Sequence, residues 1–553
     1  MGRGGRPGRA RSYRASVRAV VGGCALGNAA RLAGSLLLAA AVGCGSPRPA
    51  DTLVLASGSD LESANPVLTV HPMSRQVQRH VLFVPLVQLD SALMPVPALA
   101  RAWEWSDAGR VLTFRLRTDV RWHDGVPTTA HDARFTFDAV RDPIVASPRA
   151  GDLRDVVSLD APDDSTFVVR FRTAPPTLPL VFAEVPPIPA HALRDVPRAE
   201  WRRAPFATAP VGNGPFRFVD RTPGVRWRFA RHDAHPTALG GPPWARELIV
   251  TVVDEASTKL AGLVSGDLDV AGVSPSTAVL VARDPLLVLE TPPVLFTTVL
   301  AFNTTRAPFD DARVRRAIGL AVDRVRLVEA AVAGYGVPTS QLVPPGVFDE
   351  TMPPAQHADT TTAAQLLDAA GWVRGSDGVR RRDGAPLAVA LLTAGSGELA
   401  AEQLLQADLR AVGVEVTLRP LELATFLTTL RADEKTFDLA FTGVPGDLAL
   451  GHLRALLHGE QRGGALAYTG VASPALDTAL DAAAAAANPE ARRAAWGRVD
   501  SLVAAEAPIT VLYHARGVQG RSRALRGVRM DLRGELATVA RWSRAADDSV
   551  DTP

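Results

Sequence analysis

The sequence predicts an α/β fold, because strands and helices alternate in two separate regions. Residues Leu248–Val253 form an apolar run rich in β-branched side chains, typical of a strand buried on both faces, and Ser257–Val264 then fit a helix. Further along, the segments Leu387–Leu392, Ala400–Val412 and Gly413–Leu418 repeat the order strand, helix, strand. This alternation predicts two α/β lobes.

The first 50 residues fit a secretory targeting signal. They contain no acidic residue and carry seven arginines between Arg3 and Arg31, followed by the mostly apolar stretch Leu32–Val42. An apolar stretch of this length suits a signal peptide and is too short to span a bilayer. We therefore expect residues 1–43 to be a signal peptide and residues 44–50 to be a tether.

Both cysteines of the chain, Cys24 and Cys44, lie in this region. The segment Ala41–Cys44 and the Gly-Ser-Pro that follows resemble a bacterial lipobox, which implies that the Cys44 thiol receives a diacylglycerol. Cys24 is a weaker candidate for lipidation because the apolar run before it is shorter. The alternative to lipidation is that Cys44 is a plain thiol in a peptide that is removed. No cysteine remains in the body for a disulfide, a thiolate nucleophile or a zinc site.

Composition excludes several classes of function. The 553 residues are 47% hydrophobic and 21% charged, which is ordinary globular material for two or three domains. The net charge of +2 leaves no basic stripe for nucleic acid. Nucleophile elbows, zinc-protease motifs and nucleotide loops are all missing from the sequence, so we expect no enzyme activity and no cofactor. The nearest metal-like spacing, His232 to His235, lacks a third ligand, which favours a solvated turn over a metal site.

The stretch Leu112–Val140 gives the clearest local prediction. Apolar and polar residues alternate over Leu112–Arg117, which predicts a strand with one buried face. The segment His123-Asp124-Gly125 favours a turn. Thr129 with Asp132 resembles a capping box that opens a helix. Together these predict a strand, a tight turn and a helix, in which His123 is structural.

This stretch resembles the signature of the family 5 extracellular solute-binding proteins, the peptide and nickel receptors of ABC importers. Further segments resemble that family's motifs in the same order along residues 51–540. They are Asn213–Phe216, Val299–Asn303 with Pro308–Ile318, Ala364–Trp372 and Ser473–Asp477.

The resemblance implies a type II periplasmic-binding-protein fold, with two α/β lobes, an inserted third domain and a hinged cleft. Lobe I is expected at residues 51–95, 212–300 and 510–542, the inserted domain II at 96–211, and lobe III at 301–509. The segments near Phe302 and Ala507–Tyr513 are expected to form the hinge. The proline-rich Pro175–Pro189 fits irregular surface, and residues 543–553 fit a frayed polar tail.

The resemblance also implies a ligand-binding position. Residues Phe437–Asp447 fall where peptide-binding relatives carry an apolar strand, Gly-Trp and an aspartate that pairs with the ligand's ammonium group. By position Asp447 is that aspartate, and Val444 replaces the tryptophan. The alternative is that Asp447 is a loop acid satisfied by backbone hydrogen bonds.

The function implied is capture of a small solute, with peptide as the first expectation and a nickel chelate, a sugar or an opine as others. A monomer is expected, held outside the cytoplasm on a bacterial membrane by its lipid and passing the solute to an ABC permease driven by a separate ATPase. The alternatives are a secreted hydrolase on a related scaffold and a solute sensor without transport.

Overall fold

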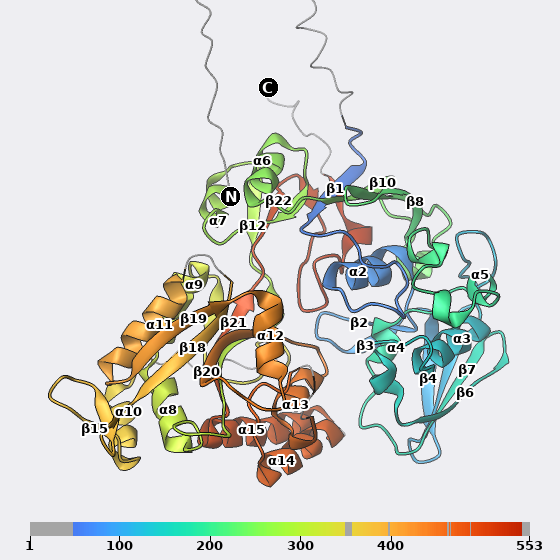
Figure 1. Cartoon of the computed structure of the whole chain (residues 1–553). Coiled ribbons are helices and arrows are strands. Elements are labelled where there is room, and N and C mark those ends of the chain that lie inside the picture. The colour runs from blue at the N-terminus through green and yellow to red at the C-terminus, as the bar shows by residue number, and fades with distance from the viewer. Residues whose placement is uncertain are drawn as a thin grey trace, which may run out of the picture. The chain divides into compact units, whose positions relative to one another are not determined.

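The computed structural model describes residues 48–348, 357–395, 399–461, 464, 466–486 and 488–544. Three sheets of seven, four and six strands organise these residues, and helices pack on them (Figure 1). The predicted α/β class is confirmed. A small hairpin, β2 (Val87–Leu89) with β3 (Pro95–Pro97), precedes the four-stranded sheet along the chain.

The seven-stranded sheet forms lobe I, with β1 (Thr52–Ser57) in its middle. Strand β1 pairs in parallel with β10 (Glu247–Val252) and with β11 (Val270–Gly272). Helix α6 (Ala256–Ser265) connects β10 to β11 and ends at Gly266 with φ +80°, so the predicted strand, helix and strand are confirmed. The other elements are α2 (Pro72–Val77), the π-helical turn η1 (Gln78–Leu82), β8 (Phe216–Thr222), β9 (Arg226–Arg231), α7 (Ala278–Arg283), β12 (Leu287–Glu290) and β22 (Gln519–Ser522).

The four-stranded antiparallel sheet belongs to the inserted domain. Helix α3 (Ala130–Arg141) begins with the predicted capping box of Thr129 and Asp132. The Asp132 carboxylate also accepts hydrogen bonds from the Trp122 indole at 3.2 Å and from the Ala190 amide at 2.8 Å, so this motif holds the domain together. The strands are β4 (Ala100–Ser106), β5 (Val111–Leu116), β7 (Thr166–Phe171) and β6 (Val156–Asp163), in that spatial order.

The prediction of irregular surface for Pro175–Pro189 is wrong. This segment contains the short helix α4 (Val181–Glu184), whose Phe182 is fully buried. The Phe182 ring meets the rings of Phe114 and Phe137 edge-on, with centroids 5.2 and 5.0 Å away. Proline prevents strand pairing but does not prevent an apolar side chain between prolines from entering the core.

The six-stranded sheet forms lobe III. Its spatial order is β14 (Gly336–Pro338), β21 (Ile509–Arg516), β13 (Pro293–Phe302), β20 (Leu439–Pro445), β18 (Ala388–Ala394) and β19 (Glu415–Leu421). Helix α11 (Ala400–Ala411) connects the parallel strands β18 and β19, as predicted. The other helices are α8 (Ala312–Ala321), α9 (Arg324–Val332), α10 (Thr360–Ala369), α12 (Leu423–Arg431), α13 (Gly451–Leu457), α14 (Pro474–Ala485) and α15 (Pro489–Glu506); β15 (Val373–Arg374), β16 (Arg380–Arg382) and β17 (Ala385–Pro386) form a small separate sheet.

Two connections cross between the sheets of lobe I and lobe III. Residues 291–292 connect β12 to β13, and residues 517–518 connect β21 to β22. The Gly517 amide donates a hydrogen bond to the Pro292 carbonyl at 2.8 Å, so the two connections lie side by side. Strands β13 and β21 belong wholly to the lobe III sheet, so the chain crosses at 291–292 and 517–518 rather than near residues 301 and 509. We propose the same three parts with the boundaries moved to these crossings.

Position 517 requires glycine because the first connection, at Pro292, passes very close to it. A Cβ there would lie 3.0 Å from Cγ of Pro292 and 3.4 Å from Cγ1 of Val294. We expect Gly517→Ala to lower the free energy of unfolding by about 1 kcal/mol, through crowding of the two connections. The control is Gly497→Ala in helix α15, where nothing lies within 4 Å and where alanine should stabilise by up to about 1 kcal/mol. Urea unfolding measures both changes, and equal stabilisation by the two would contradict the crowding.

The expected frayed tail, residues 543–553, is wrong for its first two residues, which follow a buried tryptophan and form a strand. Trp542 is fully buried, and its indole donates to Oγ1 of Thr538 at 2.9 Å. Strand β24 (Ser543–Arg544) pairs with β23 (Leu525–Arg526), and the Arg544 guanidinium forms an ion pair with the buried Asp269. A buried carboxylate needs a cationic partner, which ties this end of the chain to lobe I. Residues 545–553 lie outside the described part of the chain.

Candidate ligand-binding site

A cavity of about 500 Å³ lies between two segments that are far apart in the sequence. One segment belongs to the inserted domain and the other to lobe III, where it follows strand β20. The charged residues lining the cavity are Arg149, Asp152, Arg154 and Glu184 from the first segment, and Asp447 and Arg454 from the second. A cavity of this size and charge suits a small polar solute.

Asp447 lies two residues after β20 and caps helix α13. Its Oδ1 accepts a hydrogen bond from the Gly451 amide at 3.1 Å, and its Oδ2 accepts one from the His452 amide at 2.9 Å. Burial raises the pKa of the Asp447 carboxyl, but the hydrogen bond and charge of His452 and the two backbone amides outweigh burial and lower this pKa to about 2. The carboxylate therefore has the backbone bonds of a loop acid and also lines the cavity as an anion.

Asp152 and Glu184 place two more carboxylates in the electrostatic field of Asp447. Burial raises the pKa of Asp152, Arg149 lowers it, and the negative charges of Glu184 and Asp447 raise it further, so that the net change is upward. Asp447 also acts to raise the pKa of Glu184. Carboxylates that repel one another across a cavity are stabilised by a cation placed between them.

Glu184 is buried, with its side chain only 5% exposed, and it is surrounded by arginines. Nη2 of Arg75 lies 2.8 Å from Oε1 of Glu184, Nη1 of Arg79 lies 4.0 Å from the same atom, and Arg149 contacts Oε2. Burial raises the pKa of Glu184, but Arg149, Arg75 and Arg79 together lower it below its ordinary value. Glu184 therefore holds three guanidinium groups, of which that of Arg149 also lines the cavity.

Sequence reasoning missed Asp152 and Glu184. Only one signal was available, a single acidic residue inside the apolar run Val181–Val185. The partners of Glu184 lie up to 109 residues away, at Arg75, and sequence periodicity says nothing about contacts over that distance.

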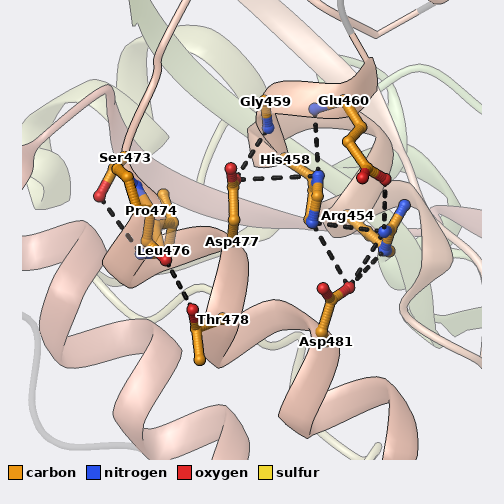
Figure 2. A network of polar contacts seen from close by, with 10 residues as sticks. All are labelled: Arg454, His458, Gly459, Glu460, Ser473, Pro474, Leu476, Asp477, Thr478 and Asp481. Carbon is orange, nitrogen blue, oxygen red and sulfur yellow. Dashed lines mark hydrogen bonds and ion pairs between the residues drawn. The ribbon is translucent and has the colours of Figure 1, made fainter.

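Arg454 is held by a polar network on lobe III, so its charge is already balanced (Figure 2). Its Nη2 lies 3.0 Å from Oδ1 of Asp481 and 3.4 Å from Oε2 of Glu460. Nδ1 of His458 accepts a hydrogen bond from the Glu460 amide at 3.1 Å, and Nε2 of His458 lies 3.4 Å from Oδ1 of Asp481. Asp477, one helical turn before Asp481 on α14, accepts the Gly459 amide at 2.8 Å.

The motif Ser473–Asp477 has a structural role at the start of the same helix. Oγ of Ser473 accepts the Leu476 amide at 3.2 Å and caps α14, and Asp477 fixes the turn after α13 (Figure 2). These contacts orient α13 and α14 relative to each other.

Val444, the second residue predicted at the site, lies in the core of lobe III with 1% of its surface exposed. The ring of Phe296 covers the neighbouring Gly443 so closely that a Cβ at Gly443 would lie 2.1 Å from it. The Val444 side chain is not among the residues that line the cavity around Asp447. The site proposed below therefore keeps Asp447 and leaves out the Val444 side chain.

Residues 232–235 form the predicted turn, in which the His235 amide donates to the His232 carbonyl at 3.0 Å, but neither histidine is exposed. His235 is buried, and the ring of His232 lies 4.9 Å from that of His123, measured between centroids. His123 and His232 both contact the Gly214 carbonyl, at 3.1 and 3.2 Å, so they clamp the turn that follows the inserted domain. Within the described ranges, no group of three or more potential ligands could hold a metal ion.

The predicted lipidation position, Cys44, lies outside the described residues. In the part of the chain that the structure describes, no helix combines the length and the apolar character needed to cross a membrane.

Two α/β lobes, an inserted domain and two adjacent crossings define the type II periplasmic-binding-protein fold, and solved structures have the same fold. NikZ of Campylobacter jejuni in complex with Ni(L-His) superimposes with a TM-score of 0.74 at 21% identity, over 90% of this chain and 100% of that one. The oligopeptide-binding protein AppA of Bacillus subtilis, in complex with a nonapeptide, gives 0.72 at 21% identity, over 90% and 99%.

The chain belongs to the bacterial extracellular solute-binding proteins of family 5, whose model for the middle part matches residues 94–452. A Brucella ovis protein named as an ABC transporter peptide-binding protein is 28% identical over 441 residues, which cover 77% of this chain and 80% of that protein. The resemblance stated from the motifs is confirmed.

Proposed function

We propose that this chain is the substrate-binding lipoprotein of an ABC importer and that it captures a short peptide in the cavity beside Asp447. The observation that carries the proposal is the group of three carboxylates, Asp447, Asp152 and Glu184, around one cavity. A peptide's α-ammonium group placed among them relieves their repulsion and can form charge-assisted hydrogen bonds with their oxygens.

Arg154 is the cation available to bind the carboxylate at the other end of the peptide. Arg149 is occupied by Asp152, at 2.8 Å, and by Glu184, and Arg454 is occupied by Asp481 and Glu460. The Arg154 side chain makes no hydrogen bond or ion pair to another described residue, although it lines the cavity. A zwitterion with its ammonium at Asp447 and its carboxylate at Arg154 therefore matches the charges of the site.

Delivery follows from hinged closure. A ligand that contacts both the inserted domain and lobe III favours the conformation in which both sets of contacts exist, and a permease that recognises this conformation receives only loaded protein. ATP hydrolysis belongs to a separate ATPase subunit. The receptor acts as a monomer outside the cytoplasm, and it returns its solute chemically unchanged.

Mass spectrometry of the solute released from purified, denatured protein tests the proposal. We expect one or a few short peptides with free amino termini, recovered intact after prolonged incubation with the protein. A nickel chelate, a sugar or an opine would replace the peptide assignment. Cleavage of the peptide would favour the hydrolase alternative, and normal uptake of that peptide by a strain lacking this protein would favour a sensor.

The lipid anchor gives a separate prediction. We expect Cys44→Ser to move the protein from the membrane fraction to the soluble fraction, because the thiol that would carry the diacylglycerol is removed. Cys24→Ser is the matched control and should leave the protein in the membrane fraction. Immunoblots of fractionated cells measure both, and unchanged fractionation of Cys44→Ser would remove Cys44 as the anchor.

A further inference from the structure

A second cavity, of about 320 Å³, is separate from the one beside Asp447 and is strongly basic. It is lined by parts of η1, of the β2–β3 hairpin and of the chain near the C-terminal end. Four guanidinium groups line it, those of Arg79, Arg529, Arg533 and Arg541, together with the ring of His80. Asp90 is the single carboxylate among the described residues that line this cavity.

Two of these side chains are half-buried, and each has one buried polar atom without a partner. Nε of Arg79 and Nε2 of His80 are shielded from solvent and have no hydrogen-bond partner in the described part of the chain. Burial lowers the pKa of Arg79 to about 10 although Glu184 raises it, and burial together with the charge of Arg79 lowers the pKa of His80 to about 3. Buried polar atoms normally have a hydrogen-bond partner. The described residues supply none to these two atoms, so a bound ligand could be their partner.

The carboxylates nearby do not balance the four arginines. Asp531 pairs with Arg533, at 2.7 Å, and with Arg529, at 3.6 Å. Glu184 lies 4.0 Å from Arg79, but Arg75 and Arg149 share this carboxylate. Asp90 is occupied by the backbone amides of Ala92 and Met94, both at 2.9 Å. The Arg541 side chain makes no hydrogen bond or ion pair to another described residue. The cavity therefore carries a net positive charge.

We propose that this cavity is a second ligand site, and that its ligand is a small oxyanion with more than one negative charge, such as a polycarboxylate or a phosphate. Planar guanidinium groups bind carboxylate and phosphate oxygens through paired hydrogen bonds, and several of them on one cavity wall favour a multivalent anion over a monovalent one. The site does not include Asp447, and its link to the peptide cavity is the contact of Arg79 with Glu184.

Titration calorimetry of the full-length protein, at constant ionic strength, tests this site with sodium citrate and inorganic phosphate as probes and acetate as the monovalent control. We expect citrate to bind one to one, at least tenfold more tightly than acetate. The double variant Arg529→Gln/Arg541→Gln should weaken citrate binding at least tenfold. Both side chains are exposed, so the fold should survive.

Two single variants distinguish citrate binding in this cavity from citrate binding elsewhere on the protein. Arg316→Gln removes an exposed arginine from α8 in lobe III, and it should change citrate affinity less than twofold. Asp447→Asn should also leave citrate affinity within twofold while it weakens peptide binding. The proposal is overturned if neither citrate nor phosphate binds at millimolar concentration. It is equally overturned if Arg316→Gln matches the double variant, or if Asp447→Asn abolishes citrate binding.

Discussion

Replacing Asp447 by asparagine should weaken the binding of a free-amine peptide by more than tenfold. Asparagine keeps an oxygen that can accept a hydrogen bond from the Gly451 or His452 amide and so preserves the cap of α13. It removes the negative charge that we propose pairs with the ligand's ammonium group. Asp447→Ala should lose at least as much affinity, because it removes the cap as well. Titration calorimetry of both variants with one peptide measures the loss.

The same peptide with an acetylated amino terminus is the matched control. Acetylation removes the ammonium group, so wild-type protein should bind the acetylated peptide more than tenfold more weakly, and Asp447→Asn should discriminate little between the two peptides. Wild-type protein that binds both peptides equally would remove Asp447 from ammonium recognition.

The pKa of Asp447 determines how peptide binding should respond to pH. The pKa of Asp447 is lowered from its ordinary value of 3.8 to about 2, so the carboxylate stays ionised in the folded protein as the pH falls to that range. Its contribution to stability is present above pH 3.8 and is lost as the pH falls from 3.8 to about 2. Peptide affinity should therefore not fall between about pH 7 and about pH 5 through titration of Asp447, which calorimetry at both pH values can check.

Replacing Glu184 by glutamine should lower the free energy of unfolding by about 3 kcal/mol, because removal of one partner from a buried ionic cluster leaves the other charges uncompensated. Arg75, Arg79 and Arg149 all contact this one carboxylate, which is almost fully buried. The lowered pKa of Glu184 means that its contribution is present above its ordinary pKa of 4.5 and is lost as the pH falls below that value.

Urea unfolding at neutral pH measures the loss, and an exposed ion pair supplies the comparison. Asp107 pairs with Arg110 at 2.7 Å, and both side chains are about half exposed. Asp107→Asn should therefore change the free energy of unfolding by less than about 1 kcal/mol. Equal effects of the two substitutions would show that the three arginines do not depend on Glu184.

The sequence predicted the parts of the fold that depend on local patterns. The capping box of Thr129 and Asp132, the helix that ends at Gly266 and the unit β18–α11–β19 were all predicted from spacing of a few residues. Such features are set by neighbours within one or two turns of the chain, which a single sequence contains in full.

Features that depend on long-range packing were not predicted correctly. Strands β13 and β21 both join the lobe III sheet, and an apolar run does not reveal which sheet a strand enters. Phe182 is buried between prolines that locally indicate surface. At the candidate site, Asp447 was predicted by its position in a family motif, whereas Asp152 and Glu184 reach the same cavity only through tertiary structure.

A hydrogen bond just beyond the paired residues of β13 and β20 connects the proposed ligand position to the first crossing. The Gly446 amide, directly before Asp447, donates to the Leu295 carbonyl at 2.7 Å, and Leu295 lies three residues after Pro292 in the first crossing. If Asp447 binds the ligand as proposed, one backbone hydrogen bond and three residues of β13 separate the ligand position from the first crossing.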